Sequence, residues 1–183
     1  FLTEALIIAA VIAFDLLLKA YAEDNLVGRN VPLISGLLSL TYVQNRGAAF
    51  GMFQGGIPVF IFITIIAFFA FFFLLYKQRD GHFLFRLSMA LIIGGTAGNF
   101  VDRVKLGYVR DMLNFDFIHF PVFNIADSAL TAGATLLCVY YLFVYKEPER
   151  EEAAEGHEAA EAHAESDGTA GESAQDGKAS DNS

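Results

Sequence analysis

The stretch IPVFIFITIIAFFAFFFLLY, Ile57–Tyr76, contains twenty consecutive residues and no charged side chain. A helix needs about 20 mostly apolar residues to cross the hydrocarbon core of a bilayer. This stretch meets that length with uninterrupted apolar and aromatic residues, so it predicts a membrane-spanning helix.

Three other apolar stretches of similar length lie outside this segment, at about Glu4–Ala22, Phe83–Val101 and Ala126–Tyr145. The core of a water-soluble domain does not need four such stretches in 146 residues. The sequence therefore predicts an all-α membrane protein with four transmembrane helices. A cleaved signal peptide ending near Ala22 is a less favoured interpretation of the first stretch, because Asp15 interrupts its apolar part and no basic residue precedes it.

The net charge of −9 divides unevenly along the chain. Residues 147–183 contain twelve acidic and two basic residues, a net charge of −10, and residues 1–146 contain nine and ten, a net charge of +1. The acidic segment has no aromatic residue and no Val, Ile, Leu or Met. Such a segment cannot bury enough apolar surface to fold. We therefore expect a membrane domain at 1–146 and a disordered acidic cytoplasmic tail at 147–183.

Charged residues between the predicted spans indicate how the chain is oriented. Lys77, Arg79 and Arg86 lie in one short connection, and cytoplasmic loops are enriched in such residues. Four spans place both termini on that same side. Arg103, Lys105 and Arg110 lie on the opposite side and weaken the pattern.

The remaining two links, about Glu23–Gly56 and Asp102–Ile125, are then extracytoplasmic. In the first link, LTYVQNRGAAFGMF at Leu40–Phe53 combines strand-like alternation with glycines, which favours a small extracytoplasmic β platform. The preceding VPLISGLLSL is expected at the membrane interface.

Polar side chains gather at the outer ends of the predicted spans. Ionisable residues in membrane segments are costly, so each is a candidate functional residue. They come from distant parts of the chain: Asp15 and Lys19; Asn99, Asp102 and Arg103; Asp111; and Asn124 and Asp127.

Each group also has a structural interpretation. Asp15 and Lys19 could form an interfacial ion pair with the lysine reaching toward water, and Asp102 could pair with Arg103. Asn124 and Asp127 have the residue types that cap a helix, and GGTAG at 94–98 has the spacing of a close helix-packing face. Asp116 and His119 are expected to be interfacial bystanders.

The combined pattern favours one kind of chemistry. Two carboxylates held together at low dielectric cannot both ionise cheaply and share a proton. Aspartic proteases use such a pair, in which one carboxylate activates water and the other protonates the scissile carbonyl. The chain has no G-x-S-x-G, P-loop, HExxH or zinc-type Cys/His spacing. The sequence thus predicts an aspartic-type hydrolase without a metal or cofactor.

Five motifs occur in a fixed order along residues 1–146. They are Asp15 with Lys19, NRGAAFG at 45–51, GNFVDR at 98–103, GYVRDM at 107–112 and FNIAD at 123–127. The ordered set resembles the bacterial lipoprotein signal peptidase (signal peptidase II) family. Three features depart from that family's pattern: Leu16 and Leu18, where it often has polar residues; Met112, where it usually has Phe; and the acidic tail after Lys146, which has no counterpart in it.

The resemblance implies a multi-pass enzyme of the bacterial inner membrane with its active site on the extracytoplasmic side. It implies an aspartyl endopeptidase that removes the signal peptide from diacylglyceryl-modified prolipoproteins by cutting just before the lipidated cysteine. It identifies Asp111 and Asp127 as catalytic. The supporting residues that it implies are Asp15, Lys19, Asn45, Gly47, Asn99, Asp102, Arg103, Asn124 and Ala126.

The expected partners are these prolipoprotein substrates and membrane lipids, with no nucleic acid, and the expected state is a monomer. Two other functions stay open at this point. A small proton-coupled transporter would use Asp15, Asp102 and Asp127 as a relay, and a non-enzymatic membrane scaffold would recruit partners through the acidic tail.

Overall fold

The computed structural model describes residues 1–47 and 57–145. By its internal contacts the chain divides into Phe1–Phe143 and Val144–Ser183, and the fold described below is that of the first unit. The predicted acidic tail lies outside the described residues, as does part of the predicted platform, at 48–53. The boundary after residue 146 stays a prediction.

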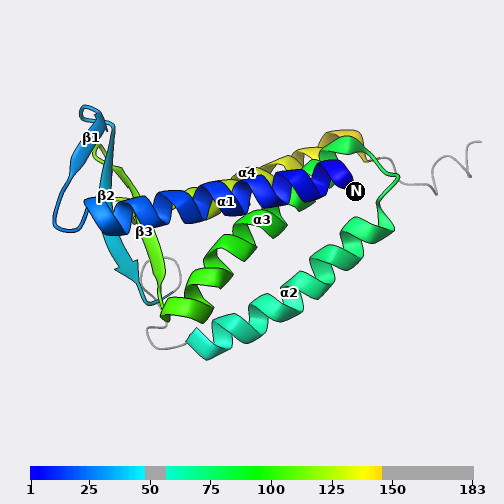
Figure 1. Ribbon diagram of the computed structural model, residues 1–183. Helices are drawn as coiled ribbons and strands as arrows, with labels where there is room; N and C mark the ends of the chain where they lie inside the picture. Colours follow the sequence, from blue (N-terminus) through cyan, green and yellow to red (C-terminus); the bar gives the residue numbers. More distant parts are fainter. Residues whose placement is uncertain (48–56, 146–183) are drawn as a thin grey trace, which may run out of the picture. The chain divides into compact units, whose positions relative to one another are not determined.

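Four helices form most of this unit (Figure 1). They are α1, Leu2–Asn25; α2, Ile57–Lys77; α3, Phe83–Leu106; and α4, Ile125–Val139, which a π-helical turn at Tyr140–Val144 continues. All four are long and apolar enough to cross a membrane, which confirms the prediction. α1 and α3 each have 24 residues, about 36 Å of helix, against about 30 Å of hydrocarbon. They extend past the predicted ends, so Asp102 and Arg103 lie within α3.

α3 is the central helix and packs against α1, α2 and α4. Its glycines allow the close approach. A Cβ added at Gly94 would lie 2.9 Å from Cβ of Val11 in α1, and one at Gly95 would meet the backbone carbonyl of Ala126 in α4. The GGTAG stretch therefore makes the close helix contacts expected from its small residues.

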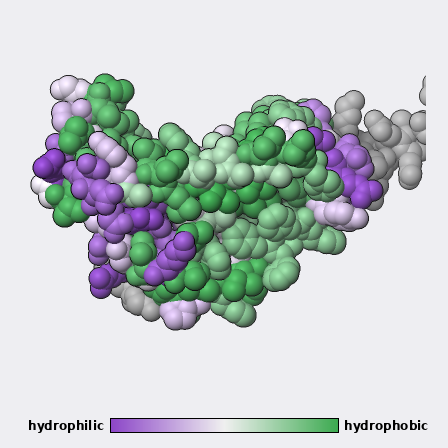
Figure 2. Space-filling view, in the orientation of Figure 1, coloured by the Kyte–Doolittle hydropathy of each residue, from purple (hydrophilic) through white to green (hydrophobic). Residues whose placement is uncertain are grey.

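The outer faces of the helices are strongly apolar. Leu17 of α1 is 69% exposed and Phe69 of α2 is 76% exposed. Figure 2 shows hydrophobic surface along the helices, with hydrophilic surface over the sheet and at the opposite end. A continuous apolar surface of this kind is unfavourable in water and suits a lipid environment.

Three short strands form an antiparallel sheet at the end of the bundle where α1 and α3 finish (Figure 1). They are β1, Val31–Ile34; β2, Leu38–Asn45; and β3, Val109–Phe115, in the order β1-β2-β3. The predicted platform exists, with two differences. VPLI is a strand of the sheet, and the stretch around Asp111, expected to be part of a link, is its third strand. Pairing with β2 satisfies the backbone groups of that stretch, with Val43 opposite Asp111.

The segment after β3 folds back onto the strand. The backbone N–H of Phe123 donates to the carbonyl of Leu113 at 3.0 Å, and the carbonyl of Phe123 accepts from Leu113 at 2.8 Å. The rings of Phe115 and Phe123 pack with centroids 5.0 Å apart, and both lie 5.8 Å from the ring of Phe120. This return brings the start of α4 next to the middle of β3.

Candidate active site

Asn124, the N-cap residue of α4, hydrogen-bonds to two aspartates. Its side-chain Nδ2 donates to Oδ1 of Asp111 at 2.7 Å, and its backbone N–H donates to Oδ2 of Asp127 at 3.2 Å. The backbone N–H of Asp127 donates back to Oδ1 of Asn124 at 2.8 Å, which completes a capping box. The capping role is therefore real. The cap also joins the carboxylates of β3 and α4 through one fully buried residue, whose side chain binds Asp111 and whose backbone binds Asp127.

Asp111 is held from the sheet as well. Its side chain is buried, with 2% exposed. Oδ2 accepts a hydrogen bond from Nδ2 of Asn45 at 3.0 Å. Asn45 and Asp111 are diagonal neighbours on paired strands. The backbone N–H of Gly47 donates to Oδ1 of Asn45 at 3.0 Å, which fixes the direction in which the amide points.

The environment of Asp111 favours its protonated form. Burial in the protein is the largest cause, and the negative charge of Asp127 adds to it. Hydrogen bonds from Asn45 and Asn124 act in the opposite direction. The net effect raises the pKa of Asp111 to about 7. Near neutral pH this carboxyl group is therefore able to keep a proton and to release it.

Asp127 also receives a hydrogen bond from α3. Nδ2 of Asn99 donates to Oδ1 of Asp127 at 2.7 Å. Oδ1 of Asn99 accepts from Nζ of Lys19 at 2.9 Å and from Nδ2 of Asn124 at 3.0 Å. The two donors fix the orientation of the Asn99 amide, so its N–H group must face the carboxylate of Asp127.

Lys19 and Asp15 connect α1 to this network. Both side chains are fully buried, and their charged atoms lie 2.7 Å apart. The interpretation in which Lys19 reaches toward water is wrong, because its ammonium contacts Asp15, Asn99 and, at 3.6 Å, Asp102. Oδ1 of Asp15 accepts from the backbone N–H of Ala126 at 2.9 Å. Asp15 thereby ties α1 to the first turn of α4.

Arg103 of α3 is a further cation of the site. Its guanidinium is 5.4 Å from the ring centroid of Phe60 in α2. It is also close enough to Asp111 and Asp127 for a charge–charge interaction. Nε of Arg103 is buried and has no hydrogen-bond partner among the described residues. The proposed Asp102–Arg103 pair is wrong, since Asp102 instead contacts Arg110 at 2.8 Å.

The structure thus brings together all eleven residues that the resemblance implies. Sequence reasoning missed two others, Arg110 and Glu23, whose charged atoms lie 2.8 Å apart. Two signals could have identified them: Arg110 precedes Asp111 in a short alternating stretch, and Glu23 follows Lys19 by one helical turn. Asp116 is exposed and accepts hydrogen bonds from Ser39 and Asn114 at the far end of β3.

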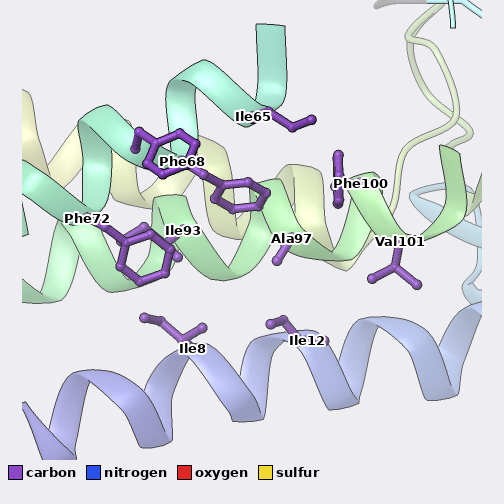
Figure 3. Close-up of a pocket in the computed structure, with 10 residues that line it drawn as sticks. Ile8, Ile12, Ile65, Phe68, Phe72, Ile93, Ala97, Phe100 and Val101 are labelled. Atoms are coloured by element: carbon purple, nitrogen blue, oxygen red, sulfur yellow. The ribbon is translucent and has the colours of Figure 1, made fainter. Parts of the chain in front are cut away.

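The described part of the chain contains no group of three or more His, Cys, Asp or Glu side chains placed to hold a metal ion. An apolar cavity of about 530 Å³ lies between α1, α2 and α3 (Figure 3). It is lined by Ile8, Ile12, Ile65, Phe68, Phe69, Phe72, Ile93, Ala97, Phe100 and Val101. Phe100 and Val101 directly separate Asn99 from Asp102 in the sequence, so this cavity approaches the polar network.

Comparison with known proteins supports this arrangement. The family described as signal peptidase (SPase) II matches residues 7–143. The lipoprotein signal peptidase of Lactobacillus johnsonii is 44% identical over 135 residues, which cover 73% of this chain and 88% of that protein. The lipoprotein signal peptidase of Clostridioides difficile is 43% identical over 140 residues, 75% of this chain and 93% of that protein.

A solved bacterial membrane enzyme at 2.3 Å resolution has the same fold, with a TM-score of 0.72 and 33% sequence identity. The similarity covers 79% of this chain and 93% of that one. Sequence, fold and the ordered motifs agree over the whole membrane unit. The chain therefore belongs to the signal peptidase II family, membrane peptidases that process prolipoproteins.

Proposed function

We propose that Asp111 and Asp127 form the catalytic pair of an aspartyl endopeptidase, and that it cuts diacylglyceryl-modified prolipoproteins just before the lipidated cysteine. One observation carries this assignment. Asn124 hydrogen-bonds to both carboxylates, and the pKa of Asp111 is raised to about 7 by burial and by the charge of Asp127. One protonated and one ionised carboxyl group are what the reaction requires.

The two aspartates divide the proton transfers between them. Asp127 removes a proton from a water molecule, whose oxygen adds to the scissile carbonyl carbon, while Asp111 gives its proton to the carbonyl oxygen. In the second step the C–N bond of the resulting diol breaks. Asp127 protonates the leaving nitrogen, and a diol hydroxyl returns a proton to Asp111. The reaction consumes one water and restores both aspartates.

The surrounding residues have distinct roles in this proposal. Asn99 and Asn124 hold the two carboxylate oxygens of Asp127 in place, and Asn45 holds Oδ2 of Asp111. The buried Nε of Arg103 lacks a partner among the described residues. We assign it to a carbonyl group of the substrate backbone, since an arginine donor left unpaired in the interior is costly.

The apolar cavity is the proposed place for one acyl chain of the substrate. A 20-residue helix, about 30 Å long and 10 Å wide, fills roughly 2,400 Å³, several times the cavity's volume of about 530 Å³. The cavity is therefore too small to enclose a signal helix. An apolar cavity of about 150 Å³ holds one benzene, with six carbons, so this cavity offers the space of roughly 20 carbons. Each buried methylene contributes about 0.8 kcal/mol.

The site is proposed to lie on the extracytoplasmic side of the inner membrane, in a monomer. Lys77, Arg79 and Arg86 lie at the opposite end of the bundle from the sheet. Arg110 is paired with Asp102 and Glu23 at the sheet end, and Arg86 is paired with Glu4 at the opposite end. Ion pairing therefore does not separate the two ends, and the proposed orientation rests on the clustering of the three cations in one short connection. The positive-inside rule then favours a cytoplasmic location for the end opposite the sheet.

The direct test uses the enzyme in liposomes with two matched peptides that contain a signal sequence and a lipobox cysteine. One carries diacylglyceryl on the cysteine and the other has a free thiol. Mass spectrometry should show a product that begins at the lipidated cysteine, and the thiol peptide should be cut at least about 100-fold more slowly, because it lacks the buried acyl chains. Equal rates would contradict the proposed recognition of the diacylglyceryl group. No cleavage of either peptide would contradict the proposed peptidase activity.

A further inference from the structure

Arg110 stands directly before Asp111 in β3, within the GYVRDM motif, and is not among the eleven site residues that the resemblance implies. Its Nη2 and Nε contact Oδ1 and Oδ2 of Asp102 at 2.8 and 3.2 Å, and its Nη1 contacts Oε2 of Glu23 at 2.8 Å. The backbone N–H of Arg110 also donates to Oδ2 of Asp102 at 3.0 Å. A single residue thus joins β3 to α3 and to the last turn of α1.

We propose that Arg110 is a positioning residue that keeps the carboxylates of Asp111 and Asp127 in their relative positions. This inference rests on the proposed catalytic pair and adds to it a residue that is not among those the resemblance implies. Its action has two parts, one through the strand to Asp111 and one through buried charges to Asp127.

The first part follows from strand geometry. Successive side chains of a strand point to opposite faces, so Arg110 and Asp111 project in opposite directions from β3. The guanidinium of Arg110 is only 12% exposed and is bonded to two helices. An anchor on one face of the strand fixes the position of the carboxylate on the other face. The carbonyl of Arg110 also accepts from Nδ2 of Asn124 at 3.4 Å, the same group that donates to Asp111.

The second part follows from the buried charges. Asp102 is 1% exposed and interacts with Arg110 and, at 3.6 Å, with Lys19. Without Arg110, a buried Asp102 would have Lys19 as its nearest cation and would attract it, because an uncompensated buried charge is strongly unfavourable. Lys19 would then move away from Asp15 and Asn99, to which it is bound at 2.7 and 2.9 Å. Asn99 would lose the contact that orients its donor toward Asp127.

Glu23 completes the arrangement. It is more exposed than its partner, at 38%, and its Oε1 accepts from the hydroxyls of Tyr42 and Tyr108 at 3.4 and 3.5 Å. These contacts hold Glu23 toward Arg110 from the sheet side. Arg110 is therefore the only residue among those described that has ion pairs with both α1 and α3 from within the sheet.

The test compares Arg110→Met, Arg110→Lys and Glu23→Gln with Lys105→Met, which removes an exposed cation from the same end of α3. Arg110→Met should lower kcat about 10- to 100-fold with KM changed less than about twofold, since small displacements of catalytic groups cost rate rather than binding. Its pH–rate midpoint should also move from the wild-type value, because Asp127, Lys19 and Arg103 face Asp111 and their positions would change. Lys105→Met should match the wild type in both quantities.

Arg110→Lys keeps the charge but cannot bind two carboxylates in a fork. It should restore the pH midpoint and recover kcat only in part. Glu23→Gln leaves the ion pair between Arg110 and Asp102 in place and should lower kcat about two- to fivefold. This variant tests the proposal even if Arg110→Met does not fold. An Arg110→Met enzyme with a wild-type midpoint, and a rate loss explained by its lower melting temperature, would overturn the proposal. That result would not affect the proposed catalytic pair. The proposal of the pair fails only if Asp111 or Asp127 proves dispensable for cleavage.

Discussion

Asn124 is the residue on which the geometry of the site most depends. Its side chain and backbone reach Asp111, Asp127 and Asn99 within 3.2 Å. A helix cap needs only part of this capacity. The start of α4 therefore serves two purposes, because the groups that terminate the helix also orient both carboxylates.

The raised pKa of Asp111 leads to a prediction about pH. Asp111 must carry a proton to act as the acid, so kcat/KM, which reports the free enzyme, should fall as the pH rises through about 7. Stability should follow the same direction. Asp111 has a higher pKa in the folded state than in the unfolded state. Its contribution to the free energy of unfolding is therefore fully present below the unfolded-state pKa, near 4, and is lost as the pH rises through about 7.

Asp111→Asn removes this titration. The melting temperature of the variant minus that of the wild type should therefore increase between pH 4 and pH 8, measured in detergent by thermal unfolding. The sign of the trend matters more than the difference at any one pH, because Asn also alters the hydrogen bonds from Asn45 and Asn124. A difference that stays constant across this range would contradict the raised pKa.

At the scale of single residues, the ordered motifs indicated which side chains gather in space but not the environment of each one. The ordered motifs pointed to Asp111 and Asp127, because chemistry restricts which residue types can serve there. They could not show that Lys19 is fully buried or that Asp102 pairs with Arg110 rather than with its neighbour. Partners of that kind come from other elements, and spacing along one helix does not reveal them.

Among the elements, β3 and α3 decide where the site forms. β3 carries Asp111 and is held by β2 on one side and by the returning segment at Phe123 on the other. The sequence favoured a link at this position, since the strand is short and its partner lies about 70 residues earlier in the chain. Strand pairing over such a separation depends on tertiary contacts rather than on local propensity.

The packing of α3 predicts that Gly98→Ala is harmful. A Cβ at residue 98 would collide with a carboxylate oxygen of Asp15 and lie 3.2 Å from Cβ of Ala126. Overpacking of this kind costs about 1–3 kcal/mol, which corresponds to a fall of about 2–10 °C in melting temperature. Because Asp15 holds Lys19 and the first turn of α4, kcat should also fall at least about tenfold.

Val104→Ala is the matched control, since Val104 lies in the same helix and is 55% exposed. It should leave melting temperature and kcat close to wild type. Thermal unfolding and peptide cleavage measured on the two variants check the prediction. Wild-type behaviour of Gly98→Ala would mean that α1, α3 and α4 are less tightly packed at the site than the structure indicates.

For the whole molecule, the hydrophobic pattern was sufficient to predict the number of spans. Apolar stretches of about 20 residues have few alternatives to crossing a bilayer. The polar end of the bundle was harder to predict, because it is assembled from α1, α3, α4 and the sheet. The sequence showed which residues are costly in a membrane, and the fold shows that most of them bind one another, with Nε of Arg103 left without a partner among the described residues.

The orientation of the molecule can be tested with single cysteines placed in a Cys138→Ser background. Val27, 63% exposed, lies at the sheet end, and Asp80, with 89% of its side chain exposed, lies between α2 and α3. A membrane-impermeant maleimide should label Val27→Cys in intact spheroplasts and should label Asp80→Cys only after permeabilisation. The reverse pattern would contradict the extracytoplasmic site.

The central claim, that Asp111 and Asp127 together perform the hydrolysis, is tested most directly by three Asp→Asn variants assayed on the lipidated peptide. Asp111→Asn and Asp127→Asn should each lower kcat at least about 1,000-fold, because each removes a proton transfer that the other residue cannot replace. Asp116→Asn changes an exposed aspartate of the same stretch and should cleave at the wild-type rate. Cleavage by Asp111→Asn or Asp127→Asn at a rate near that of Asp116→Asn would contradict the account.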